Sequence, residues 1–194
     1  MSLQLIAEIT QWTLLILVTY VLITGKANLR PVNSKLPKQD TGIPYGVQFP
    51  RTNLKTIFGD TVNINGSDVK PTIVFFTASN CPACKSLYPI IEIVRKKYES
   101  QANFVSIIVS NEKSLRDYVL INNINIPVTH LDLNYIEEFN TKIFPFAYYL
   151  SPSGHVLAKG VVSEEEHFNL LFGQGKASMQ AQKIRELNRS VSEY

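Results

Sequence analysis

Cysteine and histidine are scarce in this sequence, and their scarcity limits what the protein can be. Among 194 residues there are two cysteines and three histidines. Two cysteines are too few for a disulfide-stapled scaffold, and a chain of this length can bury a sufficient core without one. A structural zinc site needs about four ligands, and His130, His155 and His167 do not have ligand spacing. The sequence therefore favours a globular domain held together by a hydrophobic core.

The sequence also lacks the basic face that a nucleic-acid-binding protein carries. The net charge is +3, and the whole excess lies in residues 1–60, where six basic residues stand against three acidic ones. Residues 61–194 carry thirteen basic and thirteen acidic residues and are therefore neutral. This distribution argues against a nucleic-acid partner. A basic segment directly after an apolar helix is instead typical of contact with anionic lipid headgroups.

One long apolar stretch lies at the N-terminus, and its most apolar part runs from Trp12 to Ile23. A membrane-spanning helix needs roughly 20 mostly apolar residues. A cleaved signal peptide would begin with positive charge and end at a small-residue cleavage site, and neither pattern is present. We predict a transmembrane anchor over residues 1–25, with a buried helix of a soluble protein as the alternative. Taken alone, the positive charges that follow place the rest of the chain in the cytoplasm.

The remaining chain divides into three parts. Residues 26–60 are punctuated by proline and glycine, which predicts a basic tether. Residues 61–172 alternate between strand and helix patterns, and residues 173–194 form a polar tail, helical or flexible. The alternation predicts an α/β domain around one sheet. Strands are expected at 61–64, 71–77, 104–109, 128–133, 146–150 and 155–159, and helices from near 82 to 100 and at 114–122, 134–140 and 164–172.

The two cysteines stand three residues apart in Cys81-Pro82-Ala83-Cys84, where strand 73–77 gives way to a helix. Helix N-termini expose unpaired N–H groups and a positive dipole end, which stabilise a thiolate. Pro82 falls on the first helical position, where proline is tolerated. We predict that Cys81 is the exposed nucleophile, that Cys84 is the buried resolving thiol, and that the pair forms a redox disulfide reset by an electron donor or acceptor.

Pro145 is the second chemical signal, because it follows Phe144 and opens the strand expected at 146–150. Proline is permitted at the start of a strand, so its position has a purely structural interpretation. Its place after the cysteine helix and before a glycine turn also predicts a cis peptide bond that faces the disulfide. Such a bond would aim the Phe144 backbone at a substrate strand and keep metals away from Cys81. Pro82 and Ala83 are the other expected substrate contacts.

Residues 61–172 resemble a thioredoxin-like domain. The resemblance rests on an apolar strand leading to Cys-Pro-Ala-Cys84, Pro89 in the following helix, Ile-Phe-Pro145 opening a strand, and the turn Ser-Pro-Ser-Gly-His-Val156. The long stretch between Cys84 and Pro145 resembles the TlpA/ResA branch. The apolar N-terminal span, the segment Gly-Ile-Pro-Tyr-Gly46 and the CPxC motif are similar to MauD-type proteins, which are implicated in the maturation of methylamine dehydrogenase, a disulfide-rich periplasmic enzyme.

The resemblance implies a thioredoxin-like fold, with a central mixed sheet flanked by helices, and a protein thiol–disulfide oxidoreductase that needs no cofactor and no metal. Cys81 would be the nucleophile, Cys84 the resolving thiol and Pro145 the cis proline. The implied partners are a disulfide-containing protein and a membrane or soluble thiol donor. The implied location of the domain is extracytoplasmic, most simply the periplasm, against the charge bias noted above.

The sequence departs from the family beneath the disulfide. Phe75 stands where thioredoxins have a buried acid, and Ser86 and Leu87 stand where TlpA/ResA-type proteins often have glutamate. With no evident proton acceptor for Cys84, a slower reductase or isomerase with a dedicated partner fits better than a fast general reductase.

Two other interpretations of the residues stay open. One is a non-catalytic assembly module that docks a partner through Phe144 and the Tyr148/Tyr149 region, with incidental cysteines. The other is a copper or zinc carrier, with copper bound by Cys81, Cys84 and His130.

Overall fold

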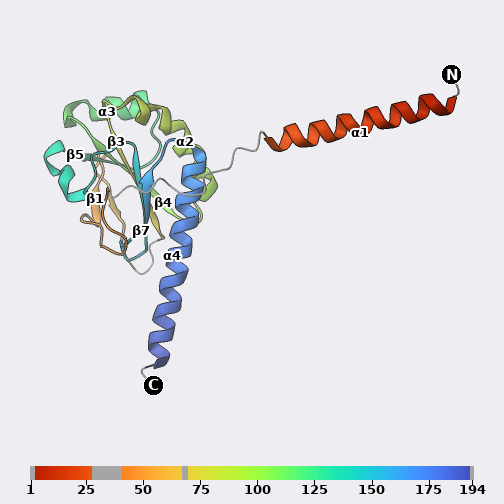
Figure 1. Cartoon of the computed structure of the whole chain (residues 1–194). Helices are drawn as coiled ribbons and strands as arrows, with labels where there is room; N and C mark the ends of the chain where they lie inside the picture. The colour runs from red at the N-terminus through yellow and green to blue at the C-terminus, as the bar shows by residue number, and fades with distance from the viewer. Residues whose placement is uncertain (1–2, 28–40, 67–69, 193–194) are drawn as a thin grey trace. The chain divides into compact units, whose positions relative to one another are not determined.

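The computed structural model describes residues 3–27, 41–66 and 70–192, and the chain divides into two units (Figure 1). The first unit, residues 1–34, contains helix α1 (Leu3–Ala27). The second unit, residues 35–194, contains the sheets and the other helices.

Helix α1 covers most of the segment predicted as a membrane anchor. Its side chains from Trp12 to Tyr20 are exposed, and most of them are apolar. Among the described residues, no helix meets both the length and the hydrophobicity that a bilayer crossing requires. The transmembrane anchor over residues 1–25 therefore stays a prediction.

A five-stranded mixed sheet forms the centre of the second unit, with the strand order β5-β4-β3-β6-β7. Strands β5, β4 and β3 run parallel to one another. Strand β6 is antiparallel to β3, and β7 is antiparallel to β6. The α/β architecture with a central mixed sheet is therefore confirmed. The strands are β3 (Thr72–Ala78), β4 (Asn103–Val109), β5 (Val128–Leu131), β6 (Phe146–Leu150) and β7 (Val156–Val161).

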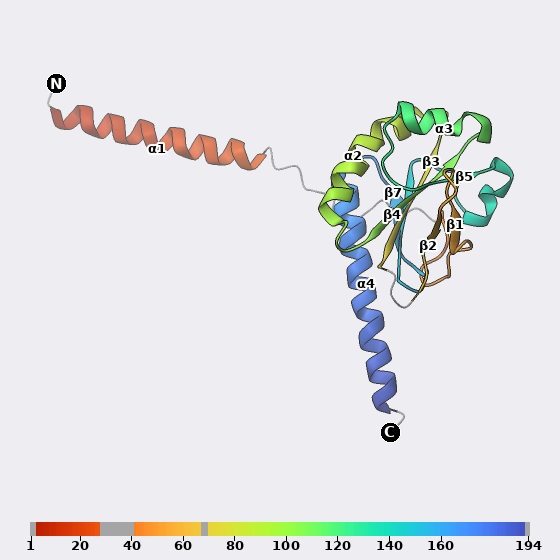
Figure 2. The same cartoon turned by 180° about the vertical axis from the view of Figure 1, so that it is seen from behind.

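Both faces of this sheet are covered, which explains why β3 is buried along its whole length. Side chains of β3 alternate, so that Ile73 and Phe75 pack on the helical side and Val74 and Phe76 on the other. The helical side holds α2 (Pro82–Tyr98), α3 (Glu112–Ile121) and α4 (Glu165–Ser192). The other side holds residues 41–66, with the hairpin of β1 (Asn53–Lys55) and β2 (Thr61–Asn63), and the 3₁₀ helix η1 (Leu133–Phe139) (Figure 2).

Residues 41–60 differ from the predicted tether, because they pack on the sheet. Ile43, Phe49 and Leu54 are buried in the core on the face of the sheet opposite α2, α3 and α4. They cover that face, which none of the described α-helices of this unit covers. The strand expected at 61–64 pairs with β1 in a separate hairpin instead of joining the main sheet. On the opposite side, the predicted closing helix and polar tail form one continuous helix, α4, through Ser192.

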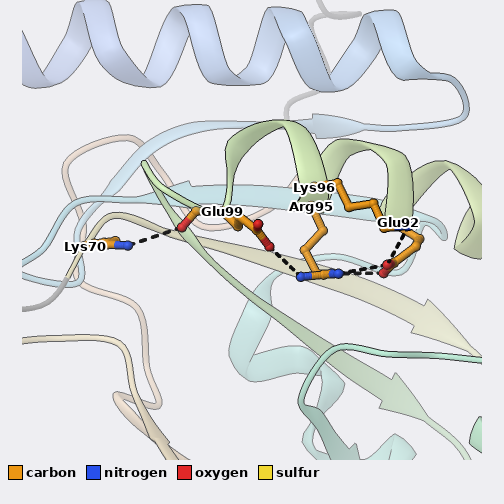
Figure 3. A network of polar contacts seen from close by, with 5 residues as sticks. All are labelled: Lys70, Glu92, Arg95, Lys96 and Glu99. Carbon is orange, nitrogen blue, oxygen red and sulfur yellow. Dashed lines mark hydrogen bonds and ion pairs between the residues drawn. The ribbon is translucent and has the colours of Figure 1, made fainter.

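The C-terminal half of α2 carries a network of ion pairs on its surface (Figure 3). The Arg95 guanidinium binds both Glu92 oxygens, at 2.8 and 2.9 Å, and one Glu99 oxygen at 2.7 Å. Lys70 donates to the Glu99 carbonyl oxygen at 3.2 Å. The hydrogen bond from Arg95 holds the pKa of Glu92 below its ordinary value. Surface pairs of this kind contribute at most about 1 kcal/mol each, and the cations suit the negative end of the helix dipole.

Candidate active site

Cys81 is the N-cap residue of α2, at the end of the loop that leaves β3. Its backbone is extended, with φ −99° and ψ 109°, and its sulfur accepts a hydrogen bond from the Cys84 backbone N–H at 3.2 Å. Pro82 occupies the first turn, where a missing N–H leaves no acceptor unsatisfied. The sulfur of Cys81 therefore lies against the unpaired amides at the positive end of the helix, where a thiolate is stabilised.

Cys81 and Cys84 form a disulfide, with their Cα atoms 5.3 Å apart. Cys81 is partly exposed, whereas Cys84 is fully buried. A partner sulfur can therefore approach Cys81 and not Cys84. The first turn of α2 contains no acidic residue, so no side chain of that turn opposes a negative charge on Cys81.

A cleft with a volume of about 990 Å³ opens at Cys81. Its walls come from the segments that follow the carboxyl ends of β3, β4 and β5, which meet at one edge of the sheet because these strands are parallel. Such an edge is where ligands bind in open α/β sheets. The lining residues include Asn80, Asn111, Lys113, His130, Asp132, Leu133, Lys142 and Phe144.

Phe144 and Pro145 lie at the end of the loop that joins η1 to β6. The peptide bond between them is cis, the geometry expected from the sequence. Phe144 is half-buried and lines the cleft together with Cys81, while Pro145 is buried. Pro82 and Ala83 are exposed beside the disulfide. The roles of these four residues in substrate binding stay predictions.

The core beneath the disulfide contains hydroxyl groups and no carboxylate. Phe75 and Leu87 are buried there, as the sequence comparison with thioredoxins anticipated, and no Asp or Glu is buried among the residues that the structure describes. Four residues after Cys84, the Tyr88 hydroxyl shares a hydrogen bond of 3.0 Å with Thr77. Burial raises the pKa of Tyr88 far above its ordinary value, so this phenol stays protonated at neutral pH and cannot take a proton from Cys84.

Several cleft residues were not singled out by the sequence, or only weakly. His130 entered only as a possible copper ligand, yet it lines the cleft with its Nε2 2.8 Å from the Ser110 carbonyl oxygen. Lys113 comes after the carboxyl end of β4 and Asp132 directly after that of β5, and both also line the cleft. The available signal was the parallel strand order, since residues just after neighbouring parallel strands share one edge.

Of the remaining histidines, His155 follows the turn before β7 and binds the Ser153 hydroxyl, and His167 lies at the start of α4 and binds the Ser163 hydroxyl. The described residues contain no group of three or more histidine, cysteine, aspartate and glutamate side chains arranged to hold a metal ion.

The docking surface considered around Tyr148 and Tyr149 is wrong. Both side chains are fully buried, one on each face of the sheet, because β6 lies between β3 and β7 and is covered on both faces. A partner cannot reach them without unfolding the domain. Of that proposed surface, only Phe144 is accessible.

Comparison with known proteins finds relatives over most of the chain, although no family model matches it. The methylamine utilization protein MauD of Methylophilus methylotrophus is 27% identical over 159 residues, which are 80% of this chain and 69% of that protein. MauD of Paracoccus versutus is 24% identical over 144 residues, which are 71% of this chain and 68% of that protein. The thioredoxin-like protein YneN of Bacillus subtilis (strain 168) is 24% identical over 121 residues, 60% of this chain and 71% of that protein.

Solved structures share the fold. A thiol:disulfide interchange protein of the thioredoxin family from Chlorobium tepidum TLS superposes with a TM-score of 0.55 at 23% identity, over 69% of this chain and 99% of that one. The thioredoxin domain of a thiol-disulfide oxidoreductase from Bacteroides vulgatus superposes with a TM-score of 0.57 at 16% identity, over 66% of this chain and 94% of that one. These likenesses confirm the thioredoxin-like fold.

Proposed function

We propose that this chain, which is a member of the thioredoxin-like superfamily related to the MauD proteins, is a thiol–disulfide oxidoreductase that acts on disulfides of other proteins. The observation that carries the proposal is the position of Cys81. Its sulfur caps α2, accepts the Cys84 N–H and faces an open cleft, with a buried second thiol one turn away. This arrangement stabilises the thiolate that disulfide exchange requires.

In the proposed cycle, the reduced protein begins with Cys81 as a thiolate and Cys84 as a thiol. The Cys81 sulfur attacks one sulfur of the partner's disulfide, which forms a mixed disulfide and releases the other partner sulfur as a thiolate. Cys84 then loses its proton and attacks the Cys81 sulfur, which releases the second partner sulfur and forms the Cys81–Cys84 disulfide. The two released partner sulfurs take up the Cys84 proton and one proton from solvent, so that the partner leaves with two thiols. A thiol donor must reduce this disulfide before the next turnover.

The chemistry around Cys84 supports a slower reductase or an isomerase. Cys84 is fully buried, and the buried hydroxyl pair of Thr77 and Tyr88 offers no base at neutral pH. A mixed disulfide that is resolved slowly has time to be attacked by another thiol of the partner, which rearranges the partner's disulfides. We therefore propose a protein with several disulfides as the partner. Methylamine dehydrogenase is the example that the MauD relatives suggest.

The proposal is tested by reducing the purified chain with a dithiol, removing the dithiol, and adding insulin. We expect one insulin disulfide to be reduced for each chain oxidised, measured by alkylation and mass spectrometry of both proteins. The variant with both Cys81→Ser and Cys84→Ser is the control and should leave insulin oxidised. Equal insulin reduction by this variant and the wild type would refute the proposed activity.

We also propose that α1 holds the protein at a membrane, with the thioredoxin-like unit on the extracytoplasmic side. The support is the row of exposed apolar side chains from Trp12 to Val18 and the oxidising compartment that exchangeable disulfides need. We expect the chain to sediment with membranes after an alkaline carbonate wash. After mild reduction, a membrane-impermeant maleimide should label Cys81 in intact cells whose outer envelope has been opened. Labelling only after lysis would place the unit in the cytoplasm.

A further inference from the structure

The segment that leads into the folded unit is hydrogen-bonded to the start of the loop that carries Phe144 and Pro145. Both the Thr41 hydroxyl and the Gly42 N–H donate to the Asn140 carbonyl oxygen, the former at 3.1 Å. In return, the Asn140 side-chain amide donates to the Gly42 carbonyl oxygen at 3.2 Å. Lys159 of β7 donates to the same Gly42 oxygen at 2.8 Å. Residues almost 100 positions apart in the chain are thus joined directly.

Tyr148 extends this connection into the core. Its buried hydroxyl donates to the Phe139 carbonyl oxygen at 2.7 Å and accepts from the Ile43 N–H at 3.3 Å. The phenol of Tyr148 therefore links segment 41–43 to the last residue of η1. The ring itself packs against Phe49, Phe76 and Phe146, so the hydroxyl has a fixed position.

Gly42 fits this site because it has no side chain. Its φ is +84°, a conformation that disfavours other residues, and a Cβ atom there would lie 2.9 Å from Tyr148 Oη and 2.9 Å from Phe146 Cζ. Neither neighbour can move freely, because both rings are buried. Gly46 offers a matched comparison in the same segment, with φ +77° and no atom within 4 Å of an added Cβ.

Few other contacts hold the middle of the loop that begins at Asn140, although the Asn140 N–H donates to the Glu137 carbonyl oxygen at 3.0 Å and Thr141 is buried. Asn140 itself is in the left-handed conformation, with φ 48°. Lys142 and Ile143 are exposed, and the Ile143 N–H has only a long bond of 3.4 Å to the Thr141 hydroxyl. At the far end, the Pro145 carbonyl oxygen accepts from the Val162 N–H at 3.4 Å. The position of Phe144, which also packs against the core of this face, therefore depends in part on where Asn140 is held.

We propose that residues 41–43 act as a brace that positions loop 140–145, and with it Phe144, for a partner's disulfide-bearing segment. The brace rests on the proposed function above, and it makes Gly42 and Asn140 positioning residues, with no part in the sulfur chemistry. Loss of the brace leaves Cys81 reactive and impairs the binding of a large substrate.

The test compares Gly42→Ala with Gly46→Ala in the full chain, using two disulfides of different size. Insulin, which needs the cleft, is reduced under turnover with a dithiol present as the reductant, and the rate without the protein is subtracted. The small disulfide 5,5′-dithiobis(2-nitrobenzoate), which needs only Cys81, is reacted with reduced protein after the dithiol has been removed. We expect Gly42→Ala to raise KM for insulin about tenfold, since misplacing a positioning group by roughly 1 Å costs up to about 100-fold. Its kcat, and its rate with the small disulfide, should match those of Gly46→Ala and the wild type.

Asn140→Gly provides a second variant in case the Gly42 change prevents folding. Glycine keeps the left-handed backbone at this position, so only the side-chain bond to the Gly42 oxygen is lost. We expect a smaller rise in KM for insulin, again with unchanged reactivity toward the small disulfide.

Amide hydrogen exchange decides the matter independently of activity. Exchange in residues 140–144 should be faster in Gly42→Ala than in Gly46→Ala, while exchange in α2 stays unchanged. Equal KM and equal exchange in the two variants would overturn the brace, and so would a parallel loss of reactivity toward the small disulfide. A wild type that reacts with the small disulfide and never with insulin would refute the proposed function, and hydrogen exchange would still test the brace.

Discussion

Replacing Cys84 by serine is expected to stop turnover at the mixed disulfide and to leave the partner covalently attached to Cys81. The reason is the geometry at the start of α2, where Cys81 is partly exposed and Cys84 is fully buried behind it. Without Cys84 the chain has no second sulfur of its own to attack the bond, and serine cannot replace it because an alkoxide is not accessible at neutral pH. Insulin reduction should fall to the background rate, and a chain–insulin adduct should appear on a non-reducing gel and disappear with a dithiol.

The matched variant is Cys81→Ser, which should abolish both turnover and the adduct. Its remaining thiol is buried, so a partner sulfur cannot reach it. The contrast between the two variants identifies the attacking sulfur. An adduct formed by Cys81→Ser and not by Cys84→Ser would reverse the roles assigned here. In cells, the protein captured by Cys84→Ser would be the natural partner.

The second large effect is expected on stability, at Gly175 in α4. Gly175 is buried, and a Cβ atom there would lie 2.7 Å from Tyr149 Cε1 and still closer to Cγ and Cδ1. Tyr149 cannot withdraw, because it is buried in β6 and its ring packs on Phe172 at 5.3 Å. Overpacking a close-packed site costs about 1–3 kcal/mol. We expect Gly175→Ala to lower the free energy of unfolding by this amount, measured by urea denaturation.

Gly173→Ala is the control, because it lies two residues earlier in the same helix and is exposed, with no atom within 4 Å of an added Cβ. Alanine is the better helix former by about 0.5–1 kcal/mol, so this change should raise the free energy of unfolding. The two glycine-to-alanine changes thus have opposite expected signs. Equal effects at both positions would contradict the packing of α4 against β6.

Much of the domain followed from local pattern. The strand into Cys81, the helix after it and the turn at Ser151–Gly154 could be located because apolar periodicity, β-branched residues and glycine act within a few residues of chain. The capping position of Cys81 could be predicted for the same reason, since a strand–helix junction with proline next in sequence defines an N-terminus. The exposed and buried positions of the two thiols follow from their spacing on one helix.

The packing of segments that are distant in sequence could not be predicted from local patterns. Proline and glycine in residues 26–60 predicted a tether, yet Ile43, Phe49 and Leu54 seal one face of the sheet. Turn residues set local conformation and carry no information on what a segment packs against. The burial of both Tyr148 and Tyr149 was missed for a similar reason. Alternating side chains show which residues share a face of a strand, but they do not show whether each face is covered by other parts of the chain.

The sequence by itself determined the chemistry proposed for this protein, because a thiolate at a helix N-terminus needs only four consecutive residues and the helix that they begin. The tertiary structure alone decided what surrounds that sulfur. The cleft exists because parallel strands bring Asn111 and Asp132 to the edge where Cys81 lies. Gly42, a residue that is distant in sequence, is hydrogen-bonded to Asn140 at the start of the loop that carries Phe144. Such contacts depend on strand order and on the space left between buried rings, which are properties of the folded chain.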